Sequence, residues 1–436
     1  MRPAAIAAFL LLGLCGAVAG AAAMPSPAQK APSSFRLASI TAEGSKRYSS
    51  DQIVAASGLE TGATAGEDDF KHAAQQLGDT GAFAEVSYSY HYSGNDAKLE
   101  FQVSDAEPFV PARFDNFVWF SDQELLSKIH QEVPLFSGEL PLSGNLADQV
   151  SNTLQGMVIE QKVEGKVDYL RSAEKENGPI NAIVFSVNGP RITIHNSNFT
   201  GAGPQELPLL QAAAHNLAGQ EYQRSILRVQ AERNFLPIFL QRGFLKARFG
   251  QVQAKVVEQD PDETVVDVSF AVEPGRQYRL GHIGWSGNKV FSTSELQPAM
   301  HVLLGEPADA VQLDADLEAV KKMYGGRGYV AAFVHPEPQF DESAGKVSYT
   351  LEVHEGDLYH MGDLDIQGLD RTYTDRVSLA WQLRQGDVYN STYPKQFLDD
   401  IFKKNLIGGG WNVAIHDTPD PRTKTVDVTL RFDSKR

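Results

Sequence analysis

Residues 346–356 read KVSYTLEVHEG, an alternating strand that ends in a turn, and strands of this kind recur along the chain. They recur about every 80 residues, and a fixed period decides the architecture, because each repeat is one small folding unit. The recurring strands are Leu99-Phe101-Val103, Ile183-Phe185-Val187, Val266-Val268-Phe270-Val272, Val347-Tyr349-Leu351-Val353 and Val426-Val428-Leu430-Phe432. We therefore predict that one module is used five times.

Each closing strand follows the same series of signals. A first strand ends in a turn, two stretches with helical periodicity follow, and then come a Gly-aromatic step and another strand, which gives the order β-α-α-β-β. The Gly-aromatic step appears as Gly81-Ala82-Phe83, Gly243-Phe244, Gly328-Tyr329 and Gly410-Trp411, and the second repeat lacks it. The predicted modules span residues 35–105, 106–189, 190–275, 276–356 and 357–436.

The composition limits the classes of partner. The formal net charge is −16 and the pI is near 5.2. This balance argues against nucleic-acid binding, because phosphate contacts need clustered Lys and Arg side chains. It also disfavours electrostatic attraction to an anionic lipid surface.

Residues 1–23 are typical of an export signal. Arg2 supplies a positive start, Ile6–Leu14 an apolar segment, and Ala21-Ala22-Ala23 a small-residue cleavage site. Residues 24–34 (MPSPAQKAPSS) are rich in Pro, Ser and Ala, which predicts a short extended linker. We therefore expect an exported protein.

The single cysteine, Cys15, lies inside this signal. A lipoprotein signal needs a small residue before its cysteine, and the large Leu14 argues against lipidation. The mature chain would then have no cysteine, so it would depend on no disulfide. After the signal, no apolar run reaches the roughly 18–20 residues that a membrane-spanning helix needs.

The fourth repeat carries the clearest motifs. Its first strand ends in Ile283-Gly284-Trp285-Ser286-Gly287-Asn288, its Gly-aromatic step is Gly328-Tyr329, and its closing strand runs into Glu355-Gly356. This set, repeated in order from about Phe35 to Arg436, resembles the POTRA module. Such modules occur five at a time before the β-barrel of the outer-membrane assembly factor BamA and its relatives. The resemblance implies an α+β fold of five tandem modules in an elongated array, each a three-stranded mixed sheet with two helices on one face.

The family's barrel is the part that we do not expect here. The sequence stops at the strand Val426–Phe432 and the four residues Asp433-Ser434-Lys435-Arg436. No series of about ten-residue alternating strands with aromatic girdles follows, and a membrane barrel needs such a series. We therefore do not transfer membrane insertion to this chain. A truncated sequence of a barrel-bearing assembly factor is an alternative.

The resemblance also implies where partners bind. In the family fold the last strand of a module is central, so the second strand is an edge whose unpaired N–H and C=O groups can accept an added strand. The candidate edges are Val86–Tyr92, Val163–Tyr169, Ala247–Val256, Val330–Pro338 and Trp411–His416. Pro336 and Pro338 remove donors and blunt the fourth of these edges.

The first edge is the preferred site. Val86, Tyr88, Tyr90 and Tyr92 follow one another at period two, and the strand contains no proline. The alternative for the tyrosine rings is packing beneath the two helices, as part of the core. That alternative leaves the edge hypothesis intact, because strand addition uses the backbone.

We expect no catalysis, cofactor or metal. His354-Glu355 and His360 lack the i, i+4 spacing that places two zinc ligands on one helix face, and Glu355-Gly356 is better explained as a turn at a module boundary. The glycine runs at 325–328 and 408–410 follow a helix and precede a strand, which is the reverse of a phosphate loop.

The leading hypothesis is a non-catalytic periplasmic array, associated with the outer membrane, that docks or chaperones outer-membrane proteins by β-strand addition. Backbone recognition is blind to sequence, which suits many different barrel precursors as clients. A second hypothesis is a structural adaptor that tethers one envelope or secretion partner. A third is an enzyme with an unrecognised site, which clustered His and carboxylate side chains would support.

Overall fold

The structure is a computed structural model that describes residues 34–173, 175, 178–260 and 262–434. The predicted export signal, with Cys15, and all but the last residue of the predicted linker lie outside the described residues. The chain divides into two compact units. One contains the residues up to Pro111 together with Leu126–Thr153, and the other contains Ala112–Leu125 together with the residues from Leu154 onward.

The fold class is α+β, as predicted, with five small sheets in the described residues. Each sheet is mixed, because one central strand pairs in parallel with the first strand and antiparallel with a hairpin partner. The strand orders are β2-β1-β4-β3, β6-β5-β8-β7, β10-β12-β11 with β9 on β12, β13-β15-β14 and β16-β18-β17.

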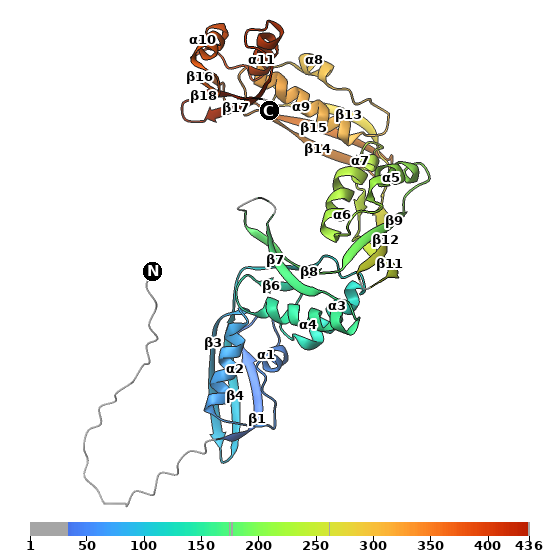
Figure 1. The fold of residues 1–436 in the computed structure, drawn as a ribbon, viewed down its shortest axis with the longest axis vertical. Helices are drawn as coiled ribbons and strands as arrows, with labels where there is room; N and C mark the ends of the chain where they lie inside the picture. Colours follow the sequence, from blue (N-terminus) through green and yellow to red (C-terminus); the bar gives the residue numbers. More distant parts are fainter. Residues whose placement is uncertain (1–33, 174, 176–177, 261, 435–436) are drawn as a thin grey trace, which may run out of the picture. The chain divides into compact units, whose positions relative to one another are not determined.

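The first sheet and its helices lie wholly in the first unit (Figure 1). Its elements are β1 (Phe35–Glu43), α1 (Ser50–Ala56), β2 (Thr64–Ala65), α2 (Glu67–Asp79), β3 (Phe83–Ser93) and β4 (Asp96–Asp105). Helix α1 begins at the N-cap Ser49, which exchanges capping bonds with Gln52. Phe70 and Leu77 of α2 are fully buried, and Phe70 contacts Tyr88 and Tyr90 of β3, so α2 packs its apolar face on the sheet.

The second set of elements is β5 (Phe109–Phe114), α3 (Asp122–Glu132), β6 (Glu139–Pro141), α4 (Leu146–Glu160), β7 (Lys166–Ala173) and β8 (Ile180–Asn188). In the first unit, β6 pairs with the start of β5. In the second unit, the end of β5 pairs with β8, which also pairs with β7. The unit boundary runs through the predicted module 106–189, so this module boundary stays a prediction.

The third set lies in the second unit. Its elements are β9 (Arg191–Thr200), α5 (Leu207–Ala213), η1 (His215–Leu217), α6 (Arg224–Gln230), η2 (Ala231–Phe235), α7 (Leu236–Leu240), β10 (Arg248–Phe249), β11 (Gln253–Gln259) and β12 (Glu263–Glu273). The sequence predicts one long helix over about residues 222–242, and the structure inserts a π turn at η2. Pro237 explains the irregularity, because it has no N–H for the carbonyl four residues earlier.

The last two sets also lie in the second unit. They comprise β13 (Arg279–Ser286), α8 (Thr293–Leu296), η3 (Gln297–Ala299), α9 (Ala310–Gly326), β14 (Phe333–Asp341) and β15 (Lys346–His354), then β16 (His360–Gln367), α10 (Arg371–Ala380), α11 (Tyr393–Lys403), β17 (Trp411–Asp420) and β18 (Thr425–Ser434). None of the helices in the described residues is both long and apolar enough to cross a membrane.

The prediction of three strands per sheet is correct only for the last two sheets. The first two gain a short fourth strand, β2 or β6, and the third sheet also contains four strands. The added strands come from the segment between the two helices, which lies against the outer side of the first strand. In the other sheets the same contact shrinks to one bridge each: Thr193↔Glu221, Arg279↔Pro307 and His360↔Val388.

In four of the sheets, a glycine at the end of the first strand allows the backbone to approach the closing strand closely. Each has a positive φ, and a Cβ there would lie about 2 Å from a carbonyl oxygen near the end of the closing strand. These glycines are Gly44, Gly201, Gly287 and Gly368. In the second repeat Asn116 replaces the glycine, and its side chain both donates to and accepts from the backbone of Val187.

Candidate partner-binding edge strands

Strand β3 lies at the outer edge of the first sheet (Figure 1). It pairs with β4 from Phe83 opposite Asp105 to Ser93 opposite Asp96, and among the described residues no strand pairs with its other side. The register is interrupted only once, near Phe83. An eleven-residue strand therefore keeps one complete row of backbone groups free of the sheet.

The hairpin turn determines which backbone groups of β3 face outward. Gly94, with φ +63°, and Asn95 form a two-residue connection, so the flanking pair Ser93↔Asp96 is hydrogen-bonded. Bonded and non-bonded pairs alternate along an antiparallel ladder. The N–H and C=O groups of the four predicted site residues therefore point away from β4: Val86, Tyr88, Tyr90 and Tyr92.

The tyrosine rings of β3 lie on the core face of the sheet, and Tyr92 is more exposed than Tyr88 and Tyr90. Tyr88 and Tyr90 are half-buried against Phe70 of α2, at ring-centroid distances of 6.3 and 5.2 Å. Tyr92 lies 5.1 Å from Phe35 and stays 53% exposed. Burial raises the pKa of Tyr88 above its usual value, so its ring is a neutral phenol at physiological pH.

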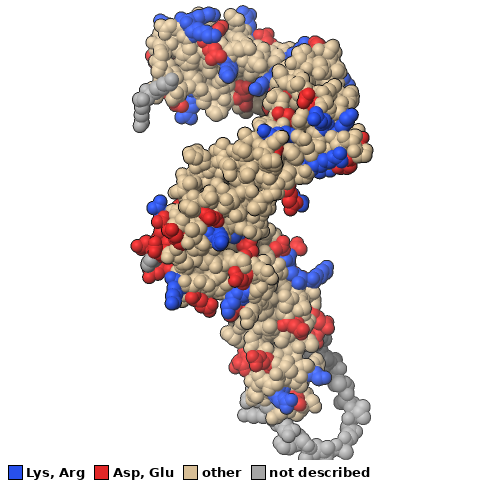
Figure 2. Space-filling view, turned by 90° about the vertical axis from the view of Figure 1, so that its right-hand side faces the viewer, with Lys and Arg blue, Asp and Glu red and all other residues tan. Residues whose placement is uncertain are grey.

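The opposite face of β3 carries polar side chains. Ser87, Ser89 and His91 are all exposed there. Across the molecular face in Figure 2, Lys and Arg side chains lie in small groups interspersed with Asp and Glu. Neither observation points to a phosphate-binding surface, which would need clustered positive charge.

The other four candidate edges also end their sheets or flank the central strand, with shifted bounds. The predicted edges at 163–169, 247–256 and 330–338 begin three to six residues before the observed strands β7, β11 and β14, and β17 extends beyond the predicted 411–416. In the third sheet, β10 and β11 occupy the predicted edge as two separate pieces. Strand propensity alone does not reveal where pairing starts, because the partner strand decides it.

Strand β14 differs from β3 in its outward groups. Pro336 and Pro338 lie opposite Leu351 and Tyr349, and neither can donate a hydrogen bond to a neighbour. Proline is tolerated in a strand where its missing N–H would have pointed to solvent. The outer edge of β14 therefore lacks two donors, as the sequence predicts.

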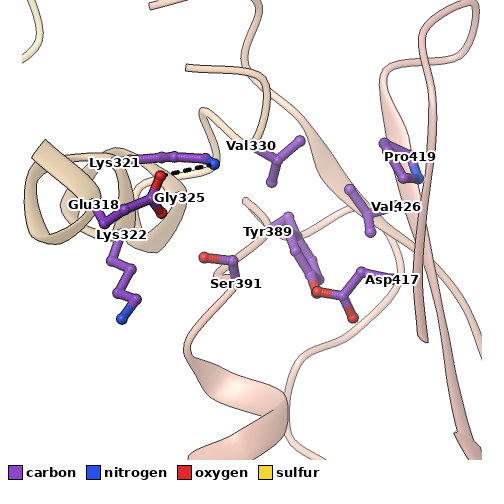
Figure 3. Close-up of a pocket in the computed structure, with 10 residues that line it drawn as sticks. All are labelled: Glu318, Lys321, Lys322, Gly325, Val330, Tyr389, Ser391, Asp417, Pro419 and Val426. Atoms are coloured by element: carbon purple, nitrogen blue, oxygen red, sulfur yellow. Dashed lines mark hydrogen bonds and ion pairs between the residues drawn. The ribbon is translucent and has the colours of Figure 1, made fainter. Parts of the chain in front are cut away.

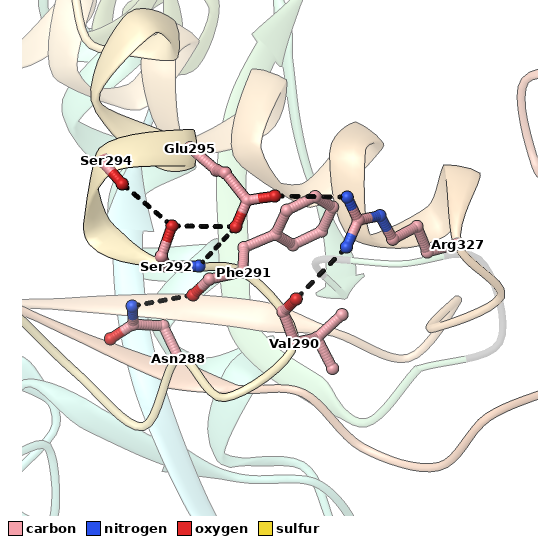
Figure 4. Close-up of polar contacts among 7 residues, drawn as sticks. All are labelled: Asn288, Val290, Phe291, Ser292, Ser294, Glu295 and Arg327. Atoms are coloured by element: carbon pink, nitrogen blue, oxygen red, sulfur yellow. Dashed lines mark hydrogen bonds and ion pairs between the residues drawn. The ribbon is translucent and has the colours of Figure 1, made fainter.

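The fourth repeat contains a polar network that its sequence motifs do not predict (Figure 4). Ser292 is the N-cap of α8, and its backbone N–H and its hydroxyl both donate to the Glu295 carboxylate at 2.8 Å. Arg327 then lies 3.4 Å from Glu295, donates to the carbonyl of Val290, and places its guanidinium 4.0 Å above the ring of Phe291. This network ties the turn after β13 to the end of α9.

The Gly-Asn and Glu-Gly motifs also have structural roles. Asn288 donates from its side chain to the carbonyl of Phe291. Glu355 accepts hydrogen bonds from the backbone N–H groups of Lys289 and Val290, at 2.6 and 2.7 Å. The acid after the closing strand therefore fixes the turn after the first strand, which explains the motif without any metal or catalytic role.

The histidines singled out in the sequence do not come together. His354 stacks on Phe333 at 4.5 Å and lies 3.6 Å from Glu352, whereas His360 begins β16. Within the described residues, no three His, Cys, Asp or Glu side chains are placed to hold a metal ion.

Comparison with known proteins gives one family match and several relatives. The POTRA family, described as a surface antigen variable number repeat, matches residues 278–356. A Treponema pallidum protein named "Putative outer membrane protein assembly factor" is 27% identical over 199 residues, covering 45% of this chain and 23% of that protein. The outer membrane protein assembly factor BamA of Neisseria meningitidis serogroup B is 24% identical over 264 residues, covering 56% and 32%.

Among solved structures, POTRA domains 3–5 of Haemophilus influenzae BamA align with 57% of this chain and 96% of that one, at 20% identity and a TM-score of 0.46. The chain spans a quarter to a third of the length of the curated relatives it matches. The motifs quoted for the fourth repeat lie inside the matched segment. Residues 278–356 therefore match the POTRA family, in a chain similar over about half its length to outer-membrane assembly factors.

Proposed function

We propose that this protein takes part in outer-membrane protein assembly by holding extended segments of client proteins along the free edge of β3. The similarity to assembly factors supports the general role. The proposed location is the periplasm, in association with the outer membrane, and the proposed clients are barrel precursors or subunits of the assembly machinery. No chemistry is part of the proposal.

One observation carries the mechanism. β3 is an eleven-residue edge strand without proline, and the outward groups of Val86, Tyr88, Tyr90 and Tyr92 form a regular row of donors and acceptors. A client strand added there would form hydrogen bonds between its own backbone groups and the outward groups of β3. These hydrogen bonds do not depend on the client's sequence. The exposed Tyr92 ring offers apolar area beside the added strand.

The test is binding of unfolded outer-membrane β-strand peptides to the mature chain, measured by fluorescence anisotropy. Tyr90→Pro removes one outward donor and leaves the β3–β4 ladder intact, because Tyr90 belongs to a non-bonded pair. Tyr90→Val is the matched control, since it removes the ring and keeps the donor. Circular dichroism confirms that each variant is folded.

We expect micromolar binding of several unrelated peptides. Losing one hydrogen bond costs about 0.5–1.5 kcal/mol, so Tyr90→Pro should weaken binding roughly two- to tenfold beyond Tyr90→Val. Equal binding by the two variants would contradict a backbone mechanism. Binding of none of the peptides would leave the single-partner adaptor as the better function.

A further inference from the structure

A cavity of about 290 Å³ lies in the second unit, where α9 meets the sheet of β16, β17 and β18 (Figure 3). Its walls come from α9, from the segment between α10 and α11, and from β17 and β18. The N–H of Ser391 donates to the carbonyl of Gly325 at 3.0 Å, so α9 and this segment are in direct backbone contact. That contact gives the cavity a defined wall.

Asp417 lies on the face of β17 that packs on the core. It stands opposite Val428 in the pairing with β18, and Pro419 opposite Val426 is the next pair on the same face. Val426 and Val428 are fully buried, whereas Asp417 remains accessible to solvent at the cavity. Acidic side chains on an apolar face are normally paired, so this aspartate marks a candidate binding site.

The carboxylate of Asp417 has no cation beside it among the described residues. Partial burial raises the pKa of Asp417 above its ordinary 3.8, and the only opposing influence is the nearby hydroxyl of Tyr389. Lys321 of α9 is paired with Glu318 at 3.5 Å, and Lys322 extends away from Asp417 (Figure 3). An ionised carboxylate at this position is therefore uncompensated within the chain.

Two hydroxyl groups line the same cavity. Tyr389 is fully buried, and its hydroxyl lies beside Asp417 without a hydrogen bond of normal geometry. Burial raises the pKa of Tyr389 well above its usual value, so the ring is a neutral phenol. The second hydroxyl is that of Ser391. The cavity thus contains one anionic and two neutral hydrogen-bond acceptors.

The rest of the lining favours an aliphatic chain. Val330, Pro419 and Val426 form apolar walls. Ligand sites usually start at about 300 Å³, so this space fits one long side chain better than a whole small molecule. A lysine side chain has an aliphatic stem that packs on apolar walls and an ammonium with three donors and no acceptor. Arginine fits less well, because its planar fork of five donors is suited to bidentate pairing.

We propose that this cavity binds a lysine side chain of a partner protein, with the ammonium held by Asp417 and the stem along the apolar walls. The bound ammonium would compensate the carboxylate that the chain leaves unpaired. It would also give the buried Tyr389 hydroxyl a hydrogen-bond partner. This site is separate from β3 and does not depend on strand addition.

The probe is the peptide Gly-Gly-Lys-Gly-Gly with both ends blocked, added to the isotope-labelled mature chain. Binding is followed by NMR through the shifts of the Tyr389 and Ser391 amides. A peptide with norleucine in place of lysine keeps an alkyl stem and lacks the ammonium, and a third peptide carries arginine.

Three variants of the chain test the residues of the site. Asp417→Asn removes the charge at nearly constant size, and Tyr389→Phe removes the hydroxyl and keeps the ring. Asp399→Asn is the matched control, because Asp399 is an exposed carboxylate of α11 that does not line the cavity. Circular dichroism confirms that each variant is folded.

We expect the lysine peptide to bind with a dissociation constant of about 1 mM, and the other two peptides to bind much more weakly. Asp417→Asn should weaken binding about tenfold or more, because a hydrogen bond to a charged acceptor is lost, and Tyr389→Phe about threefold. Asp399→Asn should leave binding unchanged.

Equal binding of the lysine peptide and either of the other two would overturn the proposal, as would undiminished binding to Asp417→Asn. The absence of any shift with about 10 mM lysine peptide would overturn it as well. The β3 variant Tyr90→Pro should bind this probe normally, so failure here and failure of the proposed function are distinguishable.

Discussion

Two junctions in the second unit share their backbone hydrogen bonds: Tyr278 bonds with Gly243 and Ala308 at the Gly243 junction, and Tyr359 bonds with Gly328 and Tyr389 at the Gly328 junction. The first, the filled junction, is closed by Phe340 and the Lys246–Glu342 pair, and the second, the open junction, keeps a cavity beside Tyr389. The repeated glycine therefore sets how consecutive repeats join, because only glycine allows the backbone to approach so closely. The side chains around the two junctions differ, because Phe340 lies beside Tyr278 at the first and the fully buried Tyr389 lies at the second.

The largest expected effect comes from removing the glycine of the filled junction. Gly243 has φ +81°, and a Cβ there would lie 2.3 Å from the carbonyl oxygen of Tyr278. A left-handed non-glycine residue costs about 1–2 kcal/mol, and the clash adds to it, so Gly243→Ala should destabilise this junction by about 2–4 kcal/mol. Hydrogen exchange of the Tyr278 and Ala308 amides measures the loss of protection.

Alanine substitutions at two further glycines test whether the close backbone approach explains the loss of stability. At Gly328 the nearest atoms to a Cβ lie at 2.9 Å, so Gly328→Ala should cost less than Gly243→Ala. At Gly410, with φ +102°, a Cβ would meet open space, and only the conformational cost of about 1–2 kcal/mol should remain. Equal losses at all three positions would show that close approach is not what these glycines provide.

The second prediction converts the filled junction into the open type. Phe340 is 36% exposed, so Phe340→Ala should cost only about 1–2 kcal/mol, less than a fully buried ring. Exchange should accelerate at Tyr278 and stay unchanged at Tyr389 in the other junction. Phe340→Leu, which keeps most of the apolar area, is the control. A loss as large with leucine would mean that the ring itself matters.

The sequence predicted the periodic parts of this fold well. The strand pattern of residues 426–432 lies inside β18, and of the two candidate caps Ser292 and Ser294 the structure uses Ser292 as the N-cap of α8. The short strands β2 and β6 were missed, because pairing over two or three residues leaves no periodic signal. In the second repeat, which lacks the Gly-aromatic step, Lys162 follows helix α4 with a positive φ of 59°, as the step glycines do in the other repeats.

The candidate sites were predictable to different degrees. The edge position of β3 followed from the family resemblance, and the blunted edge of β14 from its two prolines. The cavity at the Gly328 junction could not be predicted, because it depends on residues from α9 and β17, separated by about a hundred positions, meeting across one junction. Its signal is the comparison of repeats: proline at 419 and glycine at 325 stand where the previous repeat has large apolar residues.

The third prediction concerns the ion pair of the filled junction. Lys246 and Glu342 are both about half exposed, so solvent screens the pair and its contribution to stability is small. Lys246→Met should therefore reduce amide protection at Tyr278 only slightly, and 1 M salt should produce most of the same loss in the unmodified chain. A large loss, insensitive to salt, would indicate that the lysine stem rather than its charge supports Phe340.

The smallest expected effect is a difference in pH response between the two junctions. Hydrogen bonding to Lys246 lowers the pKa of Glu342, so its contribution is present above its ordinary value of 4.5 and is lost as pH falls below it. Burial raises the pKa of Asp417 above its ordinary 3.8, so its ionised form opposes folding, and protonation relieves this cost as pH falls from neutral.

As pH falls from neutral, the Tyr389 amide should therefore gain protection through the raised pKa of Asp417, after correction for intrinsic exchange rates. The Tyr278 amide should keep its protection until the pH falls below about 4.5 and then begin to lose it. Asp417→Asn should abolish the first response and leave the second, and Glu342→Gln should do the reverse. If both junctions instead lost protection together, the carboxyl beside Tyr389 would be acting as a stabilising anion, and the open junction would be electrostatically like the filled one.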